Sequence, residues 1–506
     1  MIERYIGDHI LNFMEDNNLF NPTQYGFRPN RCTGEAIFEY LLRIMQHFEQ
    51  NRFSIAIHLD LRKAFDTICH TRLVNKLKHY YFSDPLIKWL DNYLTNRRTI
   101  VMFNGNNSLE HKITVGVPQG SVLGPILFLL YINDLPNLKL KSYISLYADD
   151  TLLLHSSNNL IDLTNSLQED LHNVGHWMEE NKLSVNATKS EIIPYGQKTI
   201  SQSLMLNLSL NGTLLKVVDS VKFLGIIFDN SLNFTKHSLK LRKTINDKNY
   251  IFKKNKIFMD ERTSTNTVKV MINPYLDYAN IVFLGISEHL ITPIQTSFNN
   301  SMRIASRTKK SDRVKISLLL NQFDLLNFKE KTILSLLRIM KRKVDRTRLI
   351  FDDGKLFEYN EYFDGGCKII KIYSRHLANQ QKGKGEERGS DGSSTAAKNN
   401  EINAEVRDDV NFWFSQGRIH IRRDWDCPLK ITRGMLGYTM HSFTSKKSRI
   451  MNSCAILGPN LWNSLPDKLR NSKMNKDDFT SEIKNLLTNN YFKNQLTFMT
   501  GVKREV

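Results

Sequence analysis

Cysteine is scarce in this chain, and the few cysteines are widely separated. Five occur among 506 residues, and no two of them form a Cys-x-x-Cys pair. This spacing excludes a zinc ribbon or knuckle built on such pairs and argues against a secreted, disulfide-stabilised scaffold. We therefore expect a protein that stays reduced inside the cell.

Long apolar runs and biased repeats are also missing. The longest strongly apolar run, Ile126–Ile132, is far shorter than the roughly 20 residues that cross a bilayer. The N-terminus lacks the pattern of a secretory signal, so we expect no membrane partner. With 24 glycines and 12 prolines, collagen-like repeats are excluded. What remains is a globular composition, 41% apolar and 24% charged, and a length that suits about two to four domains.

Positive charge is abundant but confined. The formal net charge is +19. Residues 1–230 hold 21 basic and 23 acidic residues, a net of −2, whereas residues 231–350 hold 24 and 9, a net of +15. Residues 351–506 add a net of +6, from 25 basic and 19 acidic residues. A localised positive field suits a polyphosphate backbone, although charge alone is equally compatible with a solvated basic surface.

The first 230 residues alternate between helical and strand-like patterns, which is typical of an α+β or α/β domain. The expected helices are 1–17, 72–80, 121–133 and one with Leu160, Leu163, Leu167, Leu171, Val174 and Met178 on one face. The expected strands are 54–61, 99–103, 112–115, 142–147 and 151–155.

The remainder of the chain changes character twice. Residues 235–345 have mainly helical, basic patterns, interrupted by Pro274 and Pro293. Residues 380–407 lack periodicity and are typical of a flexible linker. Apolar and aromatic residues return after 409, and the last predicted helix has Phe479, Ile483, Leu486 and Leu487 on one face.

The strongest chemical feature is Tyr147-Ala148-Asp149-Asp150, which lies between two apolar runs. Adjacent carboxylates in a tight turn repel one another, and a divalent cation relieves the repulsion. Mg²⁺ prefers such oxygen ligands. A plain hairpin turn would also favour aspartates, so this pattern needs support from a second site.

A further acid supplies that support. Asp60 ends a predicted buried strand and precedes a helical pattern. Carboxylates from two neighbouring strands could hold two metal ions about 3.5–4 Å apart, as polymerases do for in-line phosphoryl transfer. We expect the nearby Asp66 to cap the following helix instead.

A third feature is Gly116-Val-Pro-Gln119-Gly120-Ser121, followed by an apolar helix. Its glycines permit a sharp turn from strand to helix. We expect Gln119 to lie beside the helix N-terminus, where a phosphate or sugar could bind. Simple turn chemistry explains this segment equally well when it is considered alone.

Six motifs occur in a recognisable order, and together they resemble the reverse transcriptase domain of non-LTR retrotransposons of the jockey and chicken-repeat type. They are Gln24–Arg31, Leu59–Asp66, Gly116–Ser121, Tyr147–Asp150, Leu183–Ser190 and Phe223–Ile226. The resemblance covers residues 1 to about 232 and continues more weakly through the basic helical block. The segment Gly458–Pro466 is similar to the C-terminal part of these elements.

The resemblance implies an α+β right-hand polymerase with a mostly helical C-terminal extension. Fingers and palm would span residues 1–232 and a basic thumb 233–350. A variable segment with the linker would span 351–408, and residues 409–506 have no assigned role. The implied activity is an RNA-directed DNA polymerase, a nucleotidyltransferase that extends a DNA 3′-hydroxyl on an RNA template. Its partners would be template RNA, a DNA primer or target and deoxynucleoside triphosphates, in the nucleus and cytoplasm.

The resemblance also assigns roles to single residues. Asp60, Asp149 and Asp150, with the carbonyl of Leu61, match the site for two Mg²⁺ ions, which Mn²⁺ could replace. Phe65 matches the residue beneath the sugar that favours deoxynucleotides, and Gln119 lines the nucleotide pocket. Lys189 matches a proton donor to pyrophosphate. The remaining assignments are Arg28 and Arg31 near the template or triphosphate, and Phe223, Leu224 and Gly225 as primer support.

Complete elements of this family carry an endonuclease domain and a first fingers segment ahead of the first motif. We expect this chain to lack both, because it begins at the helix before Gln24. An alternative is therefore a truncated, catalytically inactive RNA-binding remnant. Two others are a splicing factor of the group II intron maturase type and a generic two-metal nuclease or cyclase. The latter gives Phe65, Gln119 and the Phe223 segment no role.

Overall fold

The structure is a computed structural model of the chain. It describes residues 1–95, 97–196 and 206–351, and the short segments 431–434, 437–440, 461–462, 464–466, 469–470 and 474–489. The chain divides into two compact units, residues 1–332 and 333–506. The expected linker at 380–407 lies outside the described residues. The division into fingers and palm (1–232), thumb (233–350), variable segment with linker (351–408) and C-terminal region (409–506) remains a prediction.

A five-stranded sheet is the centre of the first unit. Its strand order is β13-β10-β1-β8-β7, and every neighbouring pair is antiparallel except β10 and β13. The strands are β1 (Phe53–Leu59), β7 (Tyr143–Tyr147), β8 (Asp150–Ser157), β10 (Glu191–Tyr195) and β13 (Lys216–Val217). The hairpin expected around Asp149 is therefore confirmed, as is the buried strand that leads to Asp60.

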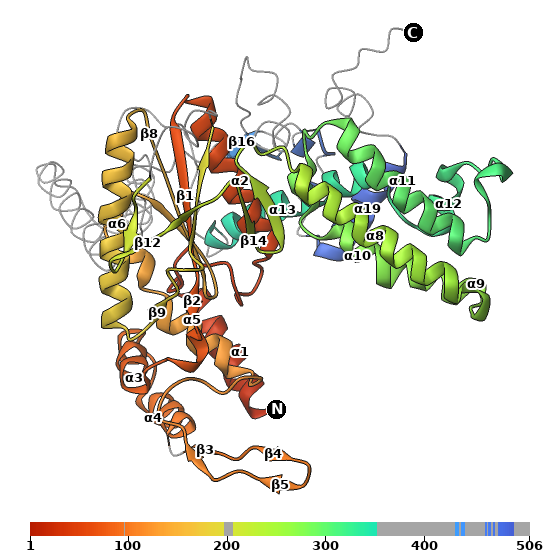
Figure 1. Cartoon of the computed structure of the whole chain (residues 1–506). Helices are drawn as coiled ribbons and strands as arrows, with labels where there is room; N and C mark the ends of the chain where they lie inside the picture. The colour runs from red at the N-terminus through yellow and green to blue at the C-terminus, as the bar shows by residue number, and fades with distance from the viewer. Residues whose placement is uncertain are drawn as a thin grey trace, which may run out of the picture. The chain divides into compact units, whose positions relative to one another are not determined.

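Helices cover this sheet on both faces (Figure 1). They are α1 (Ile2–Asp16), α2 (Thr33–Glu49), α5 (Leu123–Ile132) and α6 (Leu160–Glu180). Alternation along β1 sends Ile57 and Leu59 into the core shared with α5 and α6, while His58 on the other face packs against Tyr40 of α2. Helices α1, α5 and α6 were expected from the sequence, α1 and α6 from their apolar spacing and α5 from its continuous apolar run, whereas α2 was not.

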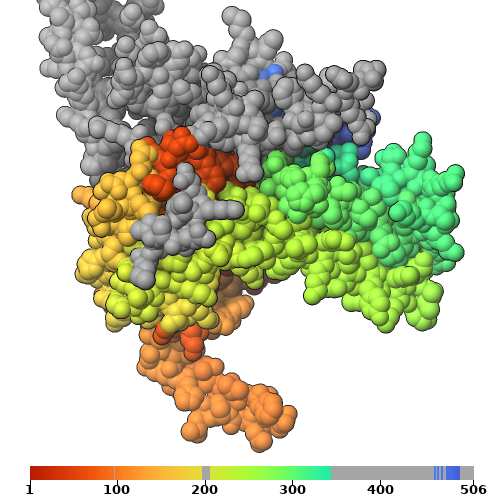
Figure 2. Space-filling model, turned by 45° about the horizontal axis from the view of Figure 1, so that its top comes forward, coloured from red at the N-terminus to blue at the C-terminus, as the bar shows by residue number. Residues whose placement is uncertain are grey.

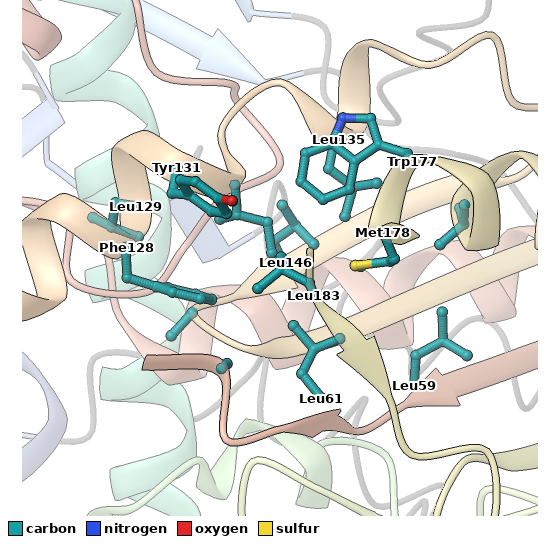
Figure 3. Close-up of a cluster of buried hydrophobic side chains, with 14 of the residues drawn as sticks. Leu59, Leu61, Phe128, Leu129, Tyr131, Leu135, Leu146, Trp177, Met178 and Leu183 are labelled. Atoms are coloured by element: carbon teal, nitrogen blue, oxygen red, sulfur yellow. The ribbon is translucent and has the colours of Figure 1, made fainter. Parts of the chain in front are cut away.

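The main core lies where α5 and α6 meet the sheet. Figure 3 shows Phe128 and Tyr131 of α5 on one side of the cluster and Trp177 and Met178 of α6 on the other, with Leu146 and Leu183 between them. Nearly every residue of α5 is buried, which explains why its sequence is apolar all round rather than amphipathic. This packing fixes the strand ends from which the functional side chains emerge.

A slender arm projects from the first unit, coloured orange in Figures 1 and 2. It follows α3 (His70–His79) and α4 (Asp84–Leu94) and consists of β3 (Arg98–Thr99), β4 (Met102–Phe103), β5 (Asn106–Asn107) and β6 (His111–Lys112). The expected turn near Asn104 is confirmed, but two continuous strands were a wrong prediction. All four short strands are exposed, so no core holds a longer ladder together.

Three short pairings complete the sheet region. β2 (Leu61–Arg62) pairs with β9 (Ser184–Val185), and β11 (Ser209–Leu210) pairs with β12 (Thr213–Leu214). β14 (Ser220–Phe223) and β15 (Ile226–Asp229) form a tight hairpin.

Residues 235–322 are helical, as expected. The segment contains α8 (Thr235–Asn255), η3 (Lys256–Phe258), α9 (Glu261–Thr267), η4 (Val268–Ile272), α10 (Asn273–Asp277), η5 (Asn280–Phe283), α11 (Glu288–Ala305), η6 (Lys310–Asp312) and α12 (Ile316–Gln322). Pro274 lies in the first turn of α10, where its missing N–H costs nothing. Pro293 lies inside α11, near its N-terminal end.

The boundary between the two units falls within α13 (Phe328–Phe351). The second unit also contains β16 (Ile431–Gly434), β17 (Gly437–Met440) and α19 (Lys476–Thr488). Phe479, Ile483 and Leu487 of α19 are buried, as the sequence predicted, and Trp462 is buried with them. Among the described residues, none of the helices has the length and apolar character needed to cross a membrane.

Candidate active site

The hairpin of β7 and β8 presents two aspartates at its tip. Tyr147 pairs with Asp150, so Ala148 and Asp149 form the turn. Ala148 has a φ of +55°, a left-handed conformation that costs a non-glycine residue roughly 1–2 kcal/mol. Such strain persists only where neighbouring structure enforces it.

Gln24 enforces this turn from the other end of the sequence. Its side chain is fully buried, and its Oε1 accepts hydrogen bonds from the backbone N–H of Gly26 (2.8 Å) and of Ala148 (3.1 Å). The residues on either side of Gln24 form backbone hydrogen bonds with Leu146. The N–H of Tyr25 donates to the Leu146 carbonyl, and the N–H of Leu146 donates to the Thr23 carbonyl. The segment 23–26 therefore clamps the aspartate turn.

Gly26 is the closest point of this clamp. A Cβ at this position would lie 2.4 Å from the backbone nitrogen of Ala148 and 3.0 Å from the carbonyl carbon of Tyr147. Both atoms are backbone, so the turn itself would have to move. The close approach gives a physical reason for glycine in the Gln24-Tyr-Gly segment, which the sequence analysis had left without a role.

Asp60 follows β1 directly, and β1 lies beside β8. The pairing of Leu59 with Thr151 places Asp60 at the same sheet end as Asp150. Its backbone is held on both sides, because its N–H donates to Ser190 Oγ (3.2 Å) and its carbonyl accepts from Asn186 N–H (2.7 Å). The turn 186–190 thus fixes Asp60 much as Gln24 fixes the hairpin turn.

The three carboxylates influence one another electrostatically. Partial burial, assisted by the charge of Asp60, raises the pKa of Asp149. Partial removal from water also raises the pKa of Asp150, to about 6, and the charges of Asp149 and Asp60 add to this shift while Lys222 opposes it. Negative charges held together at such a cost are typical of sites that a cation completes.

The chemistry of the three side chains fits a divalent cation, because carboxylate oxygens are the ligands that Mg²⁺ prefers. Within the described residues, no group of three or more His, Cys, Asp or Glu side chains is already arranged to hold a metal ion. Leu61, whose carbonyl the sequence analysis added to the set, lies in β2 and pairs with Val185. The ligand set of Asp60, Asp149, Asp150 and Leu61 remains a prediction.

The loop 116–120 is fastened to the short helix η1 (Ala64–Asp66). Gly116 N–H donates to Ile68 (2.8 Å), and Val117 N–H donates to the carbonyl of Phe65 (2.9 Å). Gln119 and Gly120 form a turn in which Gly120 has a φ of +82°, as position i+2 of a type II turn requires. Gln119 is consequently exposed, with its side chain next to η1.

Two expectations about this loop were wrong. Asp66 does not cap a helix: α3 starts at His70, and the Asp66 carboxylate instead accepts a hydrogen bond from Gln119 Nε2 (2.7 Å). The N-terminus of α5 does not offer an anion site either. Its N–H groups at Val122 and Leu123 already bond to the carboxylate of Glu3 (2.8 and 3.4 Å).

Phe65 lies half-buried between two other aromatic rings. Its ring centroid is 4.7 Å from that of Phe128 in the core and 6.4 Å from that of Phe27, which is itself exposed. Phe65 is therefore a core residue on one side and a surface residue on the other. This position is compatible with the predicted contact to a sugar.

The two arginines near the first motif are engaged within the chain. Arg28 forms a bidentate pair with Glu15 (2.8 and 2.7 Å), and its third nitrogen donates to the carbonyl of Asn21. Arg31 pairs with the buried Glu35 (3.1 Å). These contacts give both guanidinium groups a structural role, because they brace the segment that carries Gln24. Their predicted contact with a template or triphosphate has no support from this geometry.

Lys189 belongs to the turn that holds Asp60. The turn is closed by the bonds of Lys189 N–H and Ser190 N–H to the carbonyl of Asn186 (both 3.0 Å). The Lys189 side chain is exposed. The predicted proton donor thus belongs to the same turn whose Asn186 N–H bonds to the carbonyl of Asp60.

The predicted primer-support segment forms the tip of the β14–β15 hairpin. Leu224 and Gly225 both have positive φ values, +44° and +82°, as a two-residue type I′ turn requires. Phe223 packs on the His58 ring (centroids 5.3 Å apart), whose pKa burial lowers to about 3, so the imidazole is neutral. Tyr278 donates its hydroxyl hydrogen to the Leu224 carbonyl (2.7 Å) and thereby ties the tip to the helical region.

That helical region presents a surface of lysines and exposed rings. The lysine ammonium of Lys254 lies 4.5 Å from the ring centroid of Tyr250, whose side chain is 62% exposed. Phe258, at the end of η3, is 83% exposed. Rings and cations that alternate on a solvent-facing surface suit stacking on bases and pairing with phosphates.

The sequence analysis missed Gln24, Asn186, Ser190 and Glu3 as supporting residues. The first three lie inside motifs it had quoted, so their position was a usable signal. Glu3 carried none, because its partners at 122–123 are more than a hundred residues away.

Comparisons with known proteins identify a family that the first part of the chain resembles. Residues 1–228 match the protein-family model described as "Reverse transcriptase (RNA-dependent DNA polymerase)". The chain is 32% identical over 242 residues to the "Probable RNA-directed DNA polymerase from transposon BS" of Drosophila melanogaster, an alignment that covers 46% of this chain and 26% of that protein. It is 30% identical over 295 residues to the "RNA-directed DNA polymerase from mobile element jockey" of Drosophila funebris, covering 56% and 32%.

The chain thus spans about a third or less of the length of these curated relatives. Among solved structures, it is similar to a Candida tropicalis telomerase in complex with a TWJ fragment of telomeric RNA. That similarity has a TM-score of 0.37 at 12% identity and covers 80% of this chain and 56% of the other.

Proposed function

We propose that residues 1–228, which match the reverse transcriptase family model, are a reverse transcriptase domain of the α+β right-hand polymerase class, and that the chain is an RNA-directed DNA polymerase of a non-LTR retrotransposon. It would extend a DNA 3′-hydroxyl on an RNA template with deoxynucleoside triphosphates. The observation that carries the proposal is the meeting of Asp60 with the Asp149–Asp150 turn at one end of the sheet.

Two Mg²⁺ ions, or Mn²⁺ in their place, would be held by Asp60, Asp149, Asp150 and the Leu61 carbonyl. When bound, the ions would lower the pKa of the attacking hydroxyl and stabilise the leaving pyrophosphate. The carboxylates would supply the negative charge, and burial together with their mutual repulsion raises the pKa of Asp149 and Asp150, which supports a role for a compensating cation.

The surrounding residues would select and orient the reactants. Phe65, braced by Phe128, would contact the sugar face and disfavour a 2′-hydroxyl by steric conflict. Gln119 would contact the nucleotide, and Lys189, in the turn that holds Asp60, would give a proton to the departing pyrophosphate. The β14–β15 tip would hold the primer end, since Tyr278 and Phe223 fix it in place.

The basic helical region would bind the template–primer backbone. Its net charge of +15 over residues 231–350 provides the counter-charge for phosphates. The exposed rings of Tyr250 and Phe258 provide surfaces on which unpaired bases could stack.

Primer extension by the purified full chain tests the proposal. The assay contains an RNA template with an annealed DNA primer, Mg²⁺ and the four deoxynucleoside triphosphates. We expect incorporation by the natural chain and a loss of at least about a thousandfold in the double variant Asp149→Ala/Asp150→Ala, because the metal-binding charge is removed.

The matched control is Asp162→Ala, which removes an acidic residue from the first turn of α6 and should leave incorporation within about twofold. If the natural chain incorporates nothing while it still binds RNA in a salt-sensitive way, the polymerase proposal is wrong and an inactive RNA-binding remnant takes its place.

A further inference from the structure

Asp66 is an acidic residue of the reverse transcriptase domain to which the proposed mechanism assigns no role. It ends the short helix η1, directly after Phe65, and its side chain is exposed. An exposed aspartate at the end of a single helical turn does not by itself indicate a function. The residue to which Asp66 is hydrogen-bonded does.

That partner is the side-chain amide of Gln119. Gln119 Nε2 donates a hydrogen bond to Asp66 Oδ1 at 2.7 Å, across 53 residues of sequence. An ionised carboxylate can only accept hydrogen bonds, so it forces the NH₂ end of the amide toward itself. The amide oxygen Oε1 must then point away from Asp66, as an available acceptor.

The backbone beneath this pair prevents the two residues from separating. A Cβ at Gly116 would lie 2.7 Å from the carbonyl oxygen of Asp66, so the loop and η1 touch without any intervening side chain. The ring of His70 also bonds to the Gly116 carbonyl, at 2.7 Å. With both backbones fixed, the bond between Asp66 and Gln119 determines the orientation of the amide rather than the position of the loop.

We propose that Asp66 is a positioning residue of the nucleotide pocket, which holds the Gln119 amide so that its oxygen accepts a hydrogen bond from the incoming nucleotide. The matching group on the ligand is a hydrogen-bond donor, either a sugar hydroxyl or an N–H of the base. This inference rests on the proposed function, since it presumes that Gln119 faces a nucleotide.

A purely structural role for Asp66 would predict that Asp66→Ala lowers the melting temperature, whereas the proposed role predicts an effect on the nucleotide. Because Asp66 and Gln119 are both exposed, removal of the carboxylate leaves no buried group without a partner. The melting temperature should therefore change little, and the effect should fall on the nucleotide.

A double-mutant cycle in primer extension tests the inference. The variants are Asp66→Ala, Gln119→Ala and the two combined, with the KM for deoxynucleotide, kcat and primer–template affinity measured for each. We expect Asp66→Ala to raise KM about five- to tenfold with kcat within about twofold. The combined variant should be no worse than Gln119→Ala alone, because Asp66 acts only through the amide.

The isosteric variant Asp66→Asn tests the orientation itself. Its amide can accept from Gln119 Nε2 or donate to Gln119 Oε1, so it no longer forces one end of the Gln119 amide toward itself and should recover only part of the lost affinity for nucleotide. The inference would be overturned if the effects of the two alanine substitutions on KM multiplied in the combined variant. It would also be overturned if Asp66→Ala changed only the melting temperature or the primer–template affinity. No incorporation by the natural chain would instead refute the proposed function itself, and the pocket assigned to Asp66 with it.

A 2′,3′-dideoxynucleotide identifies the donor. If the donor is the sugar 3′-hydroxyl, the natural chain should prefer deoxy- over dideoxynucleotide, and Asp66→Ala should shrink that preference. If the donor is an N–H of the base, Asp66→Ala should raise KM equally for both. An Asp66→Ala variant with an unchanged KM for both nucleotides would contradict the inference.

Discussion

Residues 1–230 and residues 231–350 are built for opposite charges, although the proposed ligands of both are nucleic acids. The first region has a net charge of −2 and gathers three carboxylates at one end of its sheet. The second has a net charge of +15 and exposes lysines and aromatic rings on helices. Under the proposed function, binding a polyphosphate backbone and reacting at one phosphate impose opposite electrostatic demands, and the difference in charge would divide these demands between the two regions.

If this division holds, chemistry and affinity can be changed separately. Among the changes that test this division, the largest effect is expected from Gly26→Ala, which acts on the acidic region alone. The added Cβ would collide with the backbone of Ala148 and displace the aspartate turn. We expect kcat to fall about a hundredfold, as a displacement of about 1 Å at a reacting centre does. Steady-state primer extension measures kcat, and filter binding measures the unchanged RNA affinity.

The control is Gly34→Ala in α2, where the nearest atom to a new Cβ is the Cys32 sulfur at an ordinary 3.8 Å. Equal losses in both variants would show that the effect is general and not due to the clamp. A fall in RNA affinity for Gly26→Ala would break the comparison itself.

An intermediate effect is expected in the basic region. The triple variant Lys240→Gln/Lys243→Gln/Lys253→Gln removes three exposed charges from α8. We expect RNA affinity at about 150 mM salt to fall roughly tenfold, and the slope of log affinity against log salt to decrease by about 2–3. At saturating template–primer, kcat should be unchanged. Binding titrations at several salt concentrations measure the slope.

The matched triple variant Lys139→Gln/Lys182→Gln/Lys216→Gln removes the same charge from exposed positions of the acidic region. Its slope should be close to that of the natural chain. If the two triple variants behave alike, the positive field is not localised in function, and the comparison fails.

The smallest expected effect concerns stability and pH. A carboxyl whose pKa is higher in the folded than in the unfolded chain stabilises the fold below the unfolded pKa near 4. That stability is lost as the pH rises through the folded pKa, which is about 6 for Asp150. Asp150→Asn removes this loss, so in metal-free buffer its melting temperature should exceed that of the natural chain by about 2 °C at pH 8.

Below pH 4 the difference between Asp150→Asn and the natural chain should vanish, because Asp150 is then protonated in both states. Asp8→Asn, which removes an exposed carboxylate from α1, is the control for the loss of one negative charge as such. A destabilised Asp150→Asn at pH 8 would indicate that Asp150 supports the fold rather than straining it.

Local patterns were sufficient to predict the elements that carry the site. The apolar spacing of α6, the continuous apolar run of α5 and the paired runs around Asp149 are periodic signals within single segments. The arm at 98–112 was predicted less well, since nothing packs on its strands and no core dictates their length.

Contacts between distant segments could not be predicted in this way. The Asp66 carboxylate was assigned to a helix cap because its local sequence suits one, whereas its actual partner is Gln119. Likewise, Arg28 was predicted to lie near the template or triphosphate, whereas in the structure it pairs with Glu15. A charged side chain in a motif indicates that it has a partner, but the partner can be identified only from the fold.

The turn at 186–190 has a consequence for the order in which a growing chain can complete its site. Asp60 emerges early in synthesis, and the aspartate pair follows some ninety residues later. Yet the N–H and carbonyl of Asp60 find their partners, Ser190 and Asn186, only after a further forty residues. A copy of the gene interrupted between codons 150 and 186 would encode all three carboxylates but leave Asp60 unanchored. Such a product would keep the recognisable motifs and lack a finished site.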